Sequence, residues 1–528
     1  MRENASDLEE LRVGKPTPFL ISKYLNKNTL TIMLYLLVSA FFLLLLASRS
    51  SFLYPCNDWN DANSYFSIGK ALFNGKMPYR DVFDQKGMYL YFFYGLAYLV
   101  SHTTFAGVFI LEVVMATFSL YGIYYILSMY MRRNTALVLT PLVMAVTISS
   151  YSFYWGGSAE ELCFPFLIWG LYIVLKYFNT QYPQKSMSKM NLFVGGLLAG
   201  VVANIKFTSL GFFFAWMMWV AFSFIVRKDL LGAIKASLLF LLGMVLTFVP
   251  WIIYFGINNG LYEWYYGYVY INVFVYSNLK GEGPTLYERV YTLSKLLYWT
   301  IRQNLSYFIF VILGVFWSIC GKNKKWMERL LVPVLSFFLF LGIYIGGSVL
   351  PYYSLPLAIF TVLGFGFLGS VFDKLVVKRQ EATRHYERWT GIISRMLSLI
   401  LSVVIIWTTS INIPHMFAKK EDIFLYKFRN IIAETSNPTL LNIGCLDAGL
   451  YTVCDIVPTC RWFQTQTLPI NDVLVAQEEY IREGQTAYIL ARDSYPEVIW
   501  EQYELVGEEL WSQGELDFTY YLFRRKSS

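Results

Sequence analysis

The chain has 528 residues, of which 56% are hydrophobic, 19% aromatic and only 15% charged, whereas about 25% of residues are charged in a typical soluble domain. This composition excludes an ordinary soluble protein. The formal net charge of +7 does not indicate a nucleic-acid partner, because Lys and Arg are scattered among short loops and do not form one basic face.

Apolar runs of roughly 17 to 26 residues recur from Thr29 to about Pro414, and each is long enough to cross a hydrocarbon core about 30 Å thick as a helix. The sequence therefore predicts a polytopic α-helical membrane protein. The first run, residues 29–49, is too long for the apolar part of a cleaved signal peptide. We expect it to be retained as the first helix, after a cytoplasmic segment of residues 1–28.

Basic residues near the ends of membrane spans favour the cytoplasm, and this rule tests the topology along the whole chain. The basic clusters lie near residues 23–27, 132–133, 176–189, 227–228, 322–329 and 374–388. All of them are cytoplasmic if an even number of spans separates each cluster from the next. About eleven spans satisfy this condition: residues 29–49, 105–127, 135–151, 162–178, 191–205, 207–226, 230–255, 304–320, 330–347, 354–372 and 396–414.

The segment YLYFFYGLAYLVS, residues 89–101, is left out of this count because about 13 residues are too few to span comfortably. We expect an interfacial or re-entrant helix there. A membrane domain of residues 29–415 then carries two long loops, 50–104 and 256–303, on its outer face. The cytoplasmic loops are short and contain no glycine-rich phosphate-binding motif, so no nucleotide site is expected.

Charged residues are concentrated in the first outer loop, residues 50–104, which contains NDWNDANSYFSIGKAL and PYRDVFDQKGM. Apolar residues after Asp61 recur at helical spacing, which predicts a short interfacial helix that begins at an Asp or Asn cap. Asp61 then lies at the depth of the lipid headgroups. Helix capping is the alternative, purely structural interpretation of Asp61 and of Asp58.

Two other outer ends of early helices carry charge, namely Glu160 with Glu161 in GGSAEEL and Lys206 in ANIKFTS. An unpaired ammonium group between two apolar stretches is costly, which favours a functional role for Lys206, with snorkelling to the interface as the alternative. Helix capping is an equally good interpretation of the two glutamates.

These stretches resemble the GT-C glycosyltransferases, in particular the branch of the protein O-mannosyltransferases and the lipid A aminoarabinose transferase. The resemblance is carried by Asp61, Tyr65 and Ile68 followed by Gly75 and PYRDVFDQKG, by GGSAEELCFPF at 156–166, and by GLLAGVVANIKFTSLGFF at 196–213. It covers about residues 30–230.

The chain departs from this branch at two places. Many members have Asp-Glu where this chain has Asp61-Ala62, and Lys-Pro-Pro where it has Lys86-Gly87-Met88. Asp61 and Lys86 match the pattern, whereas details of acceptor choice are not carried over.

The resemblance implies an inverting transfer of a sugar from a polyprenyl phosphate to an acceptor hydroxyl at the outer surface. It assigns the proton-accepting carboxylate to Asp61 and the donor phosphate to Lys86 and Lys206, with Arg80 behind them. Five side chains are expected to contact the acceptor or the sugar: Glu160, Glu161, Asp58, Tyr352 and Tyr353. For the tyrosines and for the aromatic loop 256–303, anchoring at the headgroup level is the alternative.

No cofactor and no metal site are expected. A lipid monophosphate leaving group carries less charge than a pyrophosphate, so cationic side chains can suffice. The three histidines, His102, His385 and His415, are far apart in the sequence. Asp58 with Asp61 is the remaining candidate pair for a cation.

Residues 416–528 contain no further span. Strand-like runs at 439–446, 486–493 and 518–526 surround a helical pattern at 470–484, which predicts a small C-terminal α/β domain outside the membrane. Acceptor binding or support of the site is its expected role. Its cysteines, Cys445, Cys454 and Cys460, leave one disulfide open.

Two functions compete. The first is a glycosyltransferase that takes a polyprenyl-phosphate-linked sugar and decorates a cell-envelope polysaccharide, teichoic acid, lipid or protein. The second is a transporter or flippase of lipid-linked saccharides, for which ionisable residues near the middle of the membrane and related halves are expected. The charges cluster instead at outer helix ends, which favours the enzyme. The compact loops favour a bacterial plasma membrane, with membrane lipid as a further partner.

Overall fold

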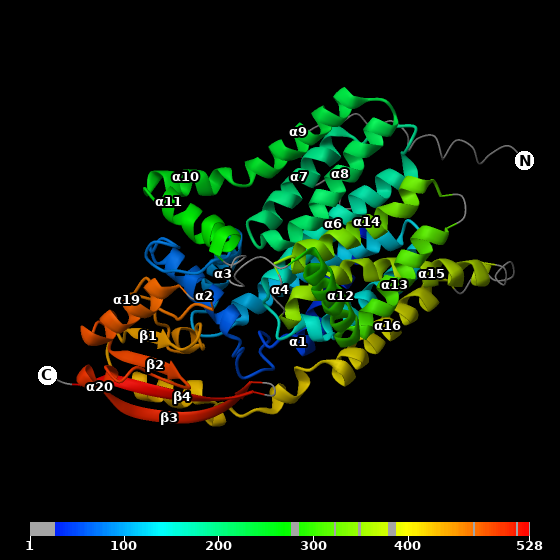
Figure 1. Cartoon of the computed structure of the whole chain (residues 1–528). Helices are drawn as coiled ribbons and strands as arrows, with labels where there is room; N and C mark the ends of the chain where they lie inside the picture. The colour runs from blue at the N-terminus through cyan, green and yellow to red at the C-terminus, as the bar shows by residue number, and fades with distance from the viewer. Residues whose placement is uncertain are drawn as a thin grey trace, which may run out of the picture.

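The computed structural model describes residues 27–275, 285–321, 324–346, 350–377, 387–467, 470–513 and 516–526. The predicted cytoplasmic segment 1–28 lies almost wholly outside the described residues. The part up to residue 409 is helical, and a small sheet lies near the C-terminus (Figure 1).

The helices of the membrane domain follow one another along the chain. They are α1 (Lys27–Ala47), α2 (Asn60–Phe73), α3 (Met88–Tyr98), α4 (Ala106–Leu127), α5 (Arg133–Ile148), α6 (Ala159–Thr180), α7 (Lys189–Ala203), α8 (Leu210–Val226), α9 (Leu230–Leu246), α10 (Val249–Ile257), α11 (Leu261–Trp264), the π-helix η4 (Tyr265–Val275), α12 (Leu286–Gln303), α13 (Leu305–Cys320), α14 (Trp326–Tyr344), the 3₁₀ helix η6 (Pro351–Phe360), α15 (Thr361–Val377) and α16 (Glu387–Thr409).

Within the described residues, 7 helices are long and apolar enough to cross a membrane, or up to 9 if each of two bent pairs is one span. The shorter apolar helices α5 and α7 coincide with the two remaining predicted spans. Each of the eleven predicted spans therefore corresponds to an apolar helix or helix pair, and the prediction of a polytopic helical membrane fold is confirmed.

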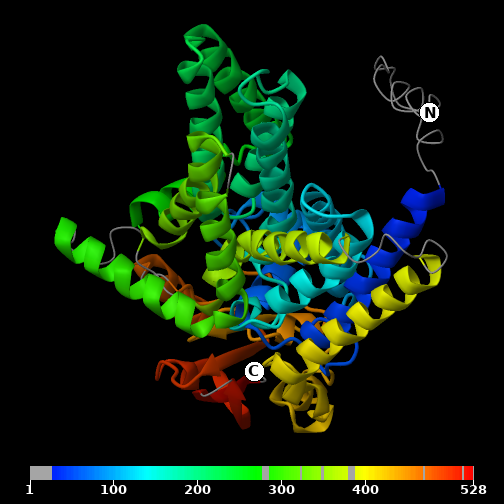
Figure 2. The same ribbon diagram turned by 90° about the vertical axis from the view of Figure 1, so that its right-hand side faces the viewer.

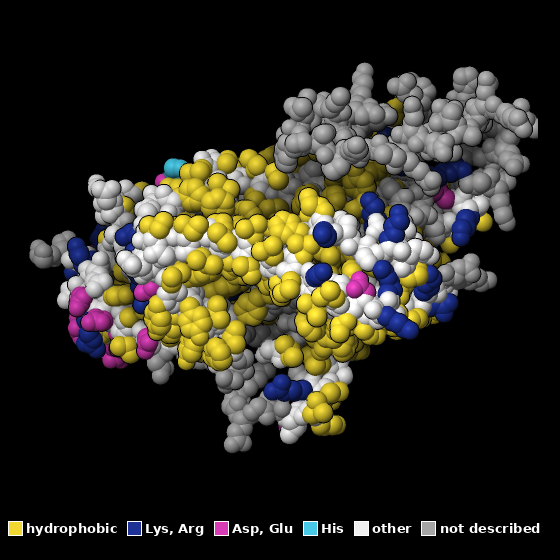
Figure 3. Space-filling model, turned by 90° about the horizontal axis from the view of Figure 1, so that it is seen from above, with side chains coloured by type: hydrophobic (Ala, Val, Ile, Leu, Met, Phe, Trp, Pro, Cys, Tyr) yellow, Lys and Arg dark blue, Asp and Glu magenta, His cyan; other side chains and the backbone are white. Residues whose placement is uncertain are grey.

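The outer surface of the described helices has the character of a membrane protein. Figure 3 shows a broad surface of hydrophobic side chains, with Lys and Arg gathered toward one end and Asp and Glu gathered at the other. Helices α1 and α16, from the beginning and the end of the membrane domain, run side by side along one edge (Figure 2). The spans thus form one body and not a row of independent hairpins.

The segment 256–303 is not the long aromatic loop that the sequence predicts. It contains α11, η4 and α12, and α12 is bent by 114° against α13. The preceding span is also broken, since α9 and α10 meet at 42°. Pro250 at the start of α10 explains this break, because proline lacks the N–H that would continue the hydrogen-bond ladder.

The C-terminal domain contains α17 (Phe424–Ile432), β1 (Leu440–Ile443), α18 (Leu450–Val453), α19 (Asn471–Arg482), β2 (Tyr488–Arg492), α20 (Ile499–Gln502), β3 (Tyr503–Gln513) and β4 (Leu516–Arg525). Its sheet has the order β1-β2-β4-β3, with β1 and β2 parallel and the other pairs antiparallel. Strand β3 was not predicted, because its charged residues mask an edge strand that pairs along β4. Cys445, Cys454 and Cys460 are all free thiols.

Helix α2 joins the two domains. Its apolar face is buried against protein, where Tyr65 contacts Tyr94 of α3 and Phe66 stacks on Phe105. The same helix carries the α2 polar stripe, which we define as Asn63, Ser64, Ser67 and Lys70. Each of these four side chains forms a hydrogen bond with the C-terminal domain. Asn63 accepts from Thr452, Ser64 accepts from Gln464, and Ser67 donates to Asp447. Lys70 donates to Asp455 and to the carbonyl of Tyr451. The C-terminal domain therefore fixes the helix that carries Asp61.

Candidate functional site

Lys86 and Lys206 are brought together by backbone contacts between their segments. The N–H of Gly87 donates to the carbonyl of Ile205 at 3.2 Å, and the N–H of Tyr89 donates to that of Asn204 at 3.0 Å. A Cβ atom on Gly87 would lie 2.0 Å from the Asn204 carbonyl oxygen, so only glycine permits this approach. The glycine that follows Lys86 thus positions it beside Lys206.

The two lysines line one cavity, which we call the lysine cavity, with a volume of about 260 Å³. It is lined by Gln85, Lys86, Ile205, Lys206, Phe207, Thr208, Tyr268, Asn272, Val273, Gly342, Ile343, Ile345, Gly346 and Tyr353. Most of the wall is apolar, and the exposed side chains of Val273 and Ile345 form part of its rim. The cavity therefore combines two cations with an apolar surface.

Lys206 is 8% exposed and forms an ion pair with Glu160. Its ammonium group lies 3.8 Å from the ring centroid of Tyr353 and 5.4 Å from that of Tyr352. The second carboxylate oxygen of Glu160 is buried without a hydrogen-bond partner among the described residues. Lys206 is thus held by one carboxylate and two aromatic rings, so the ammonium does not snorkel away from the protein.

Lys86 lies beside a second buried carboxylate. Its ammonium group is 5.9 Å from the ring centroid of Tyr65. Burial raises the pKa of the Asp84 carboxyl group, and the positive charge of Lys86 opposes this shift. Tyr91 donates a hydrogen bond to Asp84 at 2.9 Å. Sequence reasoning missed Asp84, although its position two residues before Lys86 was a usable signal.

Asp61 lies in the first turn of α2 and does not cap it. The N-cap residue is Trp59, and no side chain caps the helix, so the capping interpretation of Asp61 is wrong. The hydroxyl of Tyr352 donates to Asp61 Oδ2 at 2.5 Å, and that of Tyr65 is 3.4 Å from the same oxygen. Two tyrosines from different parts of the chain therefore hold the carboxylate.

Asp61 faces a second cavity of about 310 Å³, the aspartate cleft, between the membrane domain and the C-terminal domain. Its lining from the membrane domain is Trp59, Asn60, Asp61, Tyr154, Trp155, Leu350, Pro351 and Tyr352, and its lining from the C-terminal domain is Gly444, Cys445, Leu446, Thr465, Gln466, Thr467, Arg492 and Gln513. Tyr352 faces this cleft while its neighbour Tyr353 faces the lysine cavity. The two cavities thus share η6 as a common wall.

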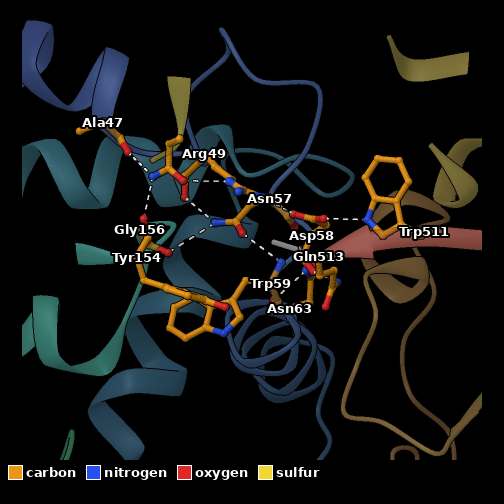
Figure 4. A network of polar contacts seen from close by, with 12 residues as sticks. Ala47, Arg49, Asn57, Asp58, Trp59, Asn63, Tyr154, Gly156, Trp511 and Gln513 are labelled. Atoms are coloured by element: carbon orange, nitrogen blue, oxygen red, sulfur yellow. Dashed lines mark hydrogen bonds and ion pairs between the residues drawn. The ribbon is translucent and has the colours of Figure 1, made fainter. Parts of the chain in front are cut away.

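Asp58 lies outside both cavities, contrary to its predicted contact with acceptor or sugar. It is buried and pairs with Arg49 at 2.9 Å, while its other carboxylate oxygen accepts from the indole N–H of Trp511 at 2.9 Å (Figure 4). Gln513 also donates to its backbone carbonyl. Both carboxylate oxygens are used structurally, so we remove Asp58 from the candidate site and from the candidate cation pair.

Glu161 and Arg80 also lie away from the cavities. The carboxylate of Glu161 accepts from the N–H of Gly157 at 2.8 Å and contacts the buried Glu112, whereas Lys206 pairs with Glu160. Arg80 is largely exposed and pairs with Asp81 at 2.9 Å. Of the nine predicted site residues, the structure gathers Asp61, Lys86, Lys206, Glu160, Tyr352 and Tyr353.

The sequence led us to expect that the C-terminal domain binds the acceptor or supports the site, but it singled out none of that domain's residues, most clearly not Arg492. Trp59 and Trp155, which line the cleft from the membrane domain, were also not predicted. Arg492 ends strand β2, and an arginine at the end of a predicted strand gives no signal of a site far away in the sequence. Among the described residues, no three His, Cys, Asp or Glu side chains come together as a metal site would require.

Comparison with known proteins identifies the fold. No family model matches the chain, and no curated protein is significantly similar to it in sequence. The crystal structure of ArnT from Cupriavidus metallidurans bound to undecaprenyl phosphate superposes with a TM-score of 0.56 and 11% identity, over 93% of this chain and 98% of that one. Its apo state gives the same TM-score and identity over 94% and 98%. The fold expected from the GT-C resemblance is therefore confirmed.

A second protein is similar at a lower level. AglB, an archaeal oligosaccharyltransferase from Archaeoglobus fulgidus in complex with an inhibitory peptide and a dolichol-phosphate, gives a TM-score of 0.46 and 12% identity. The match covers 88% of this chain and 69% of that one.

Proposed function

We propose, from an ArnT-like fold in which two cavities share η6 and Asp61 lines one of them, that the protein transfers a sugar from a polyprenyl phosphate to a hydroxyl group of a cell-envelope acceptor. The observation that carries the proposal is the shared wall of the two cavities. Tyr353 stacks on Lys206 in one cavity, and Tyr352 donates to Asp61 in the other. A donor and an acceptor can therefore occupy separate spaces and react at the boundary.

The lysine cavity suits the donor. Its two ammonium groups match an anionic phosphate, and its apolar wall and exposed apolar rim match a lipid chain that enters from the bilayer. The fold neighbour ArnT binds undecaprenyl phosphate, which supports the same class of donor for this chain. Cationic side chains, and not a metal ion, are proposed to stabilise the leaving phosphate.

The chemistry assigns a separate role to each group. Asp61 takes the proton from the acceptor hydroxyl while that oxygen attacks the anomeric carbon of the sugar. The bond between this carbon and the phosphate oxygen breaks, and its electron pair leaves with the polyprenyl phosphate, which Lys86 and Lys206 stabilise. Attack from the cleft, on the side opposite the phosphate, inverts the anomeric configuration. The hydrogen bond from Tyr352 orients the Asp61 carboxylate.

The orientation in the membrane follows from the same assignment. Lys and Arg gather toward one end of the molecule, and basic loops favour the cytoplasm (Figure 3). The aspartate cleft borders the C-terminal domain, and that domain lies toward the other end of the molecule (Figure 1). We therefore propose that the C-terminal domain and the site lie outside a bacterial plasma membrane.

The test compares Asp61→Asn with wild type after reconstitution with radiolabelled polyprenyl-phosphate sugars and candidate glycan acceptors. Loss of a general base lowers the rate by roughly 10²- to 10⁴-fold. Asp81→Asn is the matched control, because Asp81 lies in the same loop but pairs with Arg80 outside the cavities. Wild-type transfer by a folded Asp61→Asn protein would show that Asp61 is not the base.

The same experiment separates the enzyme from a transporter. A flippase moves intact lipid-linked sugar across the membrane without forming a glycosidic bond. Protection of labelled donor from an external reagent, without any new glycoside, would overturn the transferase.

A further inference from the structure

The aspartate cleft has two chemically different sides. The membrane domain contributes aromatic rings, with Trp59 and Tyr352 only 4.8 Å apart between centroids. Flat aromatic faces of this kind stack on sugar rings. The C-terminal domain contributes polar groups, including Thr465 and Arg492. The volume of about 310 Å³ is at the lower end for a ligand site, which suits a sugar unit of an acceptor.

Arg492 supplies the positive charge of this cleft. It is the one cationic side chain among the lining residues that the structure describes. One of its terminal nitrogens donates to the carbonyl of Gly444 at 3.2 Å, and its guanidinium lies 4.5 Å from the ring centroid of Phe518. These contacts hold the side chain in place. A guanidinium has five N–H donors, and Gly444 and Tyr520 take only part of them, so terminal N–H groups remain for a ligand, whereas Nε itself is buried.

One neighbouring acid pairs with this cation. Asp493 is half-exposed and forms an ion pair with Arg492, in which its carboxylate lies 3.8 Å from Nε, too long for a hydrogen bond, so the pair is weak and leaves the terminal nitrogens to a ligand. The other oxygen of Asp493 accepts from the N–H of Thr519. Among the described residues, the acid that lines the cleft is Asp61, which is bound by Tyr352. The cleft thus has a carboxylate on the membrane side and a guanidinium on the C-terminal side.

We propose that the acceptor is a saccharide that carries an anionic group, either a carboxylate or a phosphate, and that Arg492 determines this specificity. The anion binds the guanidinium through charge-assisted hydrogen bonds, while repulsion by Asp61 prevents the reverse orientation. The opposite end of the sugar then presents its hydroxyl to Asp61. The inference rests on the proposed function, because it gives the acceptor class of the same reaction.

The experiment uses three acceptors that differ at one carbon: an alkyl glucoside, the matching alkyl glucuronide, and the alkyl glucoside 6-phosphate. Both acceptor binding without donor and transfer from a labelled polyprenyl-phosphate sugar are measured. Variants are Arg492→Gln, Arg492→Lys, and the control Arg482→Gln, which changes an exposed arginine of α19 outside the cleft.

Wild type is expected to prefer one or both anionic acceptors over the neutral one by about tenfold or more. Arg492→Gln is expected to abolish this preference, because it raises the KM of the anionic acceptors by about tenfold or more and that of the neutral acceptor much less. Arg492→Lys is expected to retain part of the preference for anionic acceptors. We expect it to retain more of the preference for the phosphate than for the carboxylate, because lysine keeps the positive charge but lacks the planar guanidinium that binds a carboxylate through two hydrogen bonds. Arg482→Gln is expected to change nothing.

Three results would overturn the inference. They are equal use of neutral and anionic acceptors by wild type, an equal loss for all acceptors in Arg492→Gln, and a preference that survives in Arg492→Gln. Transfer would still occur in these cases, so the proposed function would stand. If wild type transfers to none of the acceptors but binds the anionic ones in an Arg492-dependent way, the proposed function fails and the anion site remains.

Discussion

At the residue scale, the ion pair of Glu160 and Lys206 affects the stability of the protein, while Lys206 is also proposed to bind the donor phosphate. The pair is buried, and Lys206 also contacts two tyrosine rings. A buried ion pair seldom adds stability, yet removal of one partner leaves the other charge buried and unpaired. Lys206 therefore affects the stability of the protein, and a test of phosphate binding must measure this effect separately from the loss of binding.

We expect Lys206→Met to destabilise the protein by about 3 to 5 kcal/mol, because the Glu160 carboxylate loses its partner. The double variant Lys206→Met/Glu160→Gln is expected to recover most of that loss. Binding of undecaprenyl phosphate is expected to remain weakened by roughly tenfold or more in both. Thermal unfolding in detergent and titration with the lipid phosphate measure the two effects.

Lys185→Met, at an exposed position, is the control for the loss of one positive charge. Recovery of wild-type lipid binding in the double variant would show that Lys206 has only a structural role.

At the element scale, α2 is the connection between the cleft and the C-terminal domain. Its polar stripe bonds to that domain, while Asp61 lies in its first turn. The most buried of these bonds joins Ser67 to Asp447 at 2.5 Å. The carboxylate of Asp447 also accepts from the N–H of Gly449 at 2.8 Å. The protonation state of Asp447 therefore affects how tightly α2 is bound to the C-terminal domain.

Burial raises the pKa of Asp447 from 3.8 to about 6. The folded protein then binds this proton more tightly than the unfolded protein, so the contribution of Asp447 to stability falls as pH rises from about 4 to about 6 and is constant above. A shift of about two units corresponds to about 3 kcal/mol. We expect Asp447→Asn to remove this decrease in stability between about pH 4 and pH 6, as measured by thermal unfolding from pH 4 to pH 7.

The exposed Asp472 provides the control, since Asp472→Asn is expected to leave the pH profile as it is in wild type. An Asp447→Asn profile that falls as steeply as wild type would assign the pH dependence to other groups.

At the scale of the whole molecule, the C-terminal domain is part of the body that forms the candidate site. It contributes half of the aspartate cleft, and its strand β3 reaches Asp58 through Trp511 (Figure 4). Asp58 in turn pairs with Arg49, which lies between α1 and α2 and donates to Asn412 beyond α16. One buried network therefore connects the first span, the last span and the C-terminal domain.

We expect a chain truncated after His415 to lose transfer completely and to unfold at a lower temperature. The truncation exposes the buried Lys70 and removes the partner of the α2 polar stripe, so α2 and Asp61 lose their support. Size-exclusion chromatography, thermal unfolding and the transfer assay measure these effects against a control chain that ends at Lys526. A truncated protein with wild-type stability would show that the two domains are independent.

The sequence by itself determined the spans, because a helix must bury about 20 apolar residues to cross the bilayer, and each predicted span is an apolar helix or pair. It also placed Asp61, Lys86 and Lys206 together through one resemblance, and their cavities adjoin. Only the tertiary structure decided which neighbouring charge faces the site. Asp58 and Asp61 are three residues apart, yet one pairs with Arg49 and the other lines the cleft.

The tertiary structure also decided between Glu160 and Glu161. Glu160 pairs with Lys206 and Glu161 accepts from Gly157, because adjacent positions on a helix point in different directions. The contribution of Arg492 could not be predicted either, because this residue lies more than four hundred residues after Asp61 and approaches it only through the docking of the C-terminal domain. Hydrophobicity is a local property of the chain and can be read along it. Proximity of charges depends on long-range packing, which the pattern of apolar residues leaves undetermined.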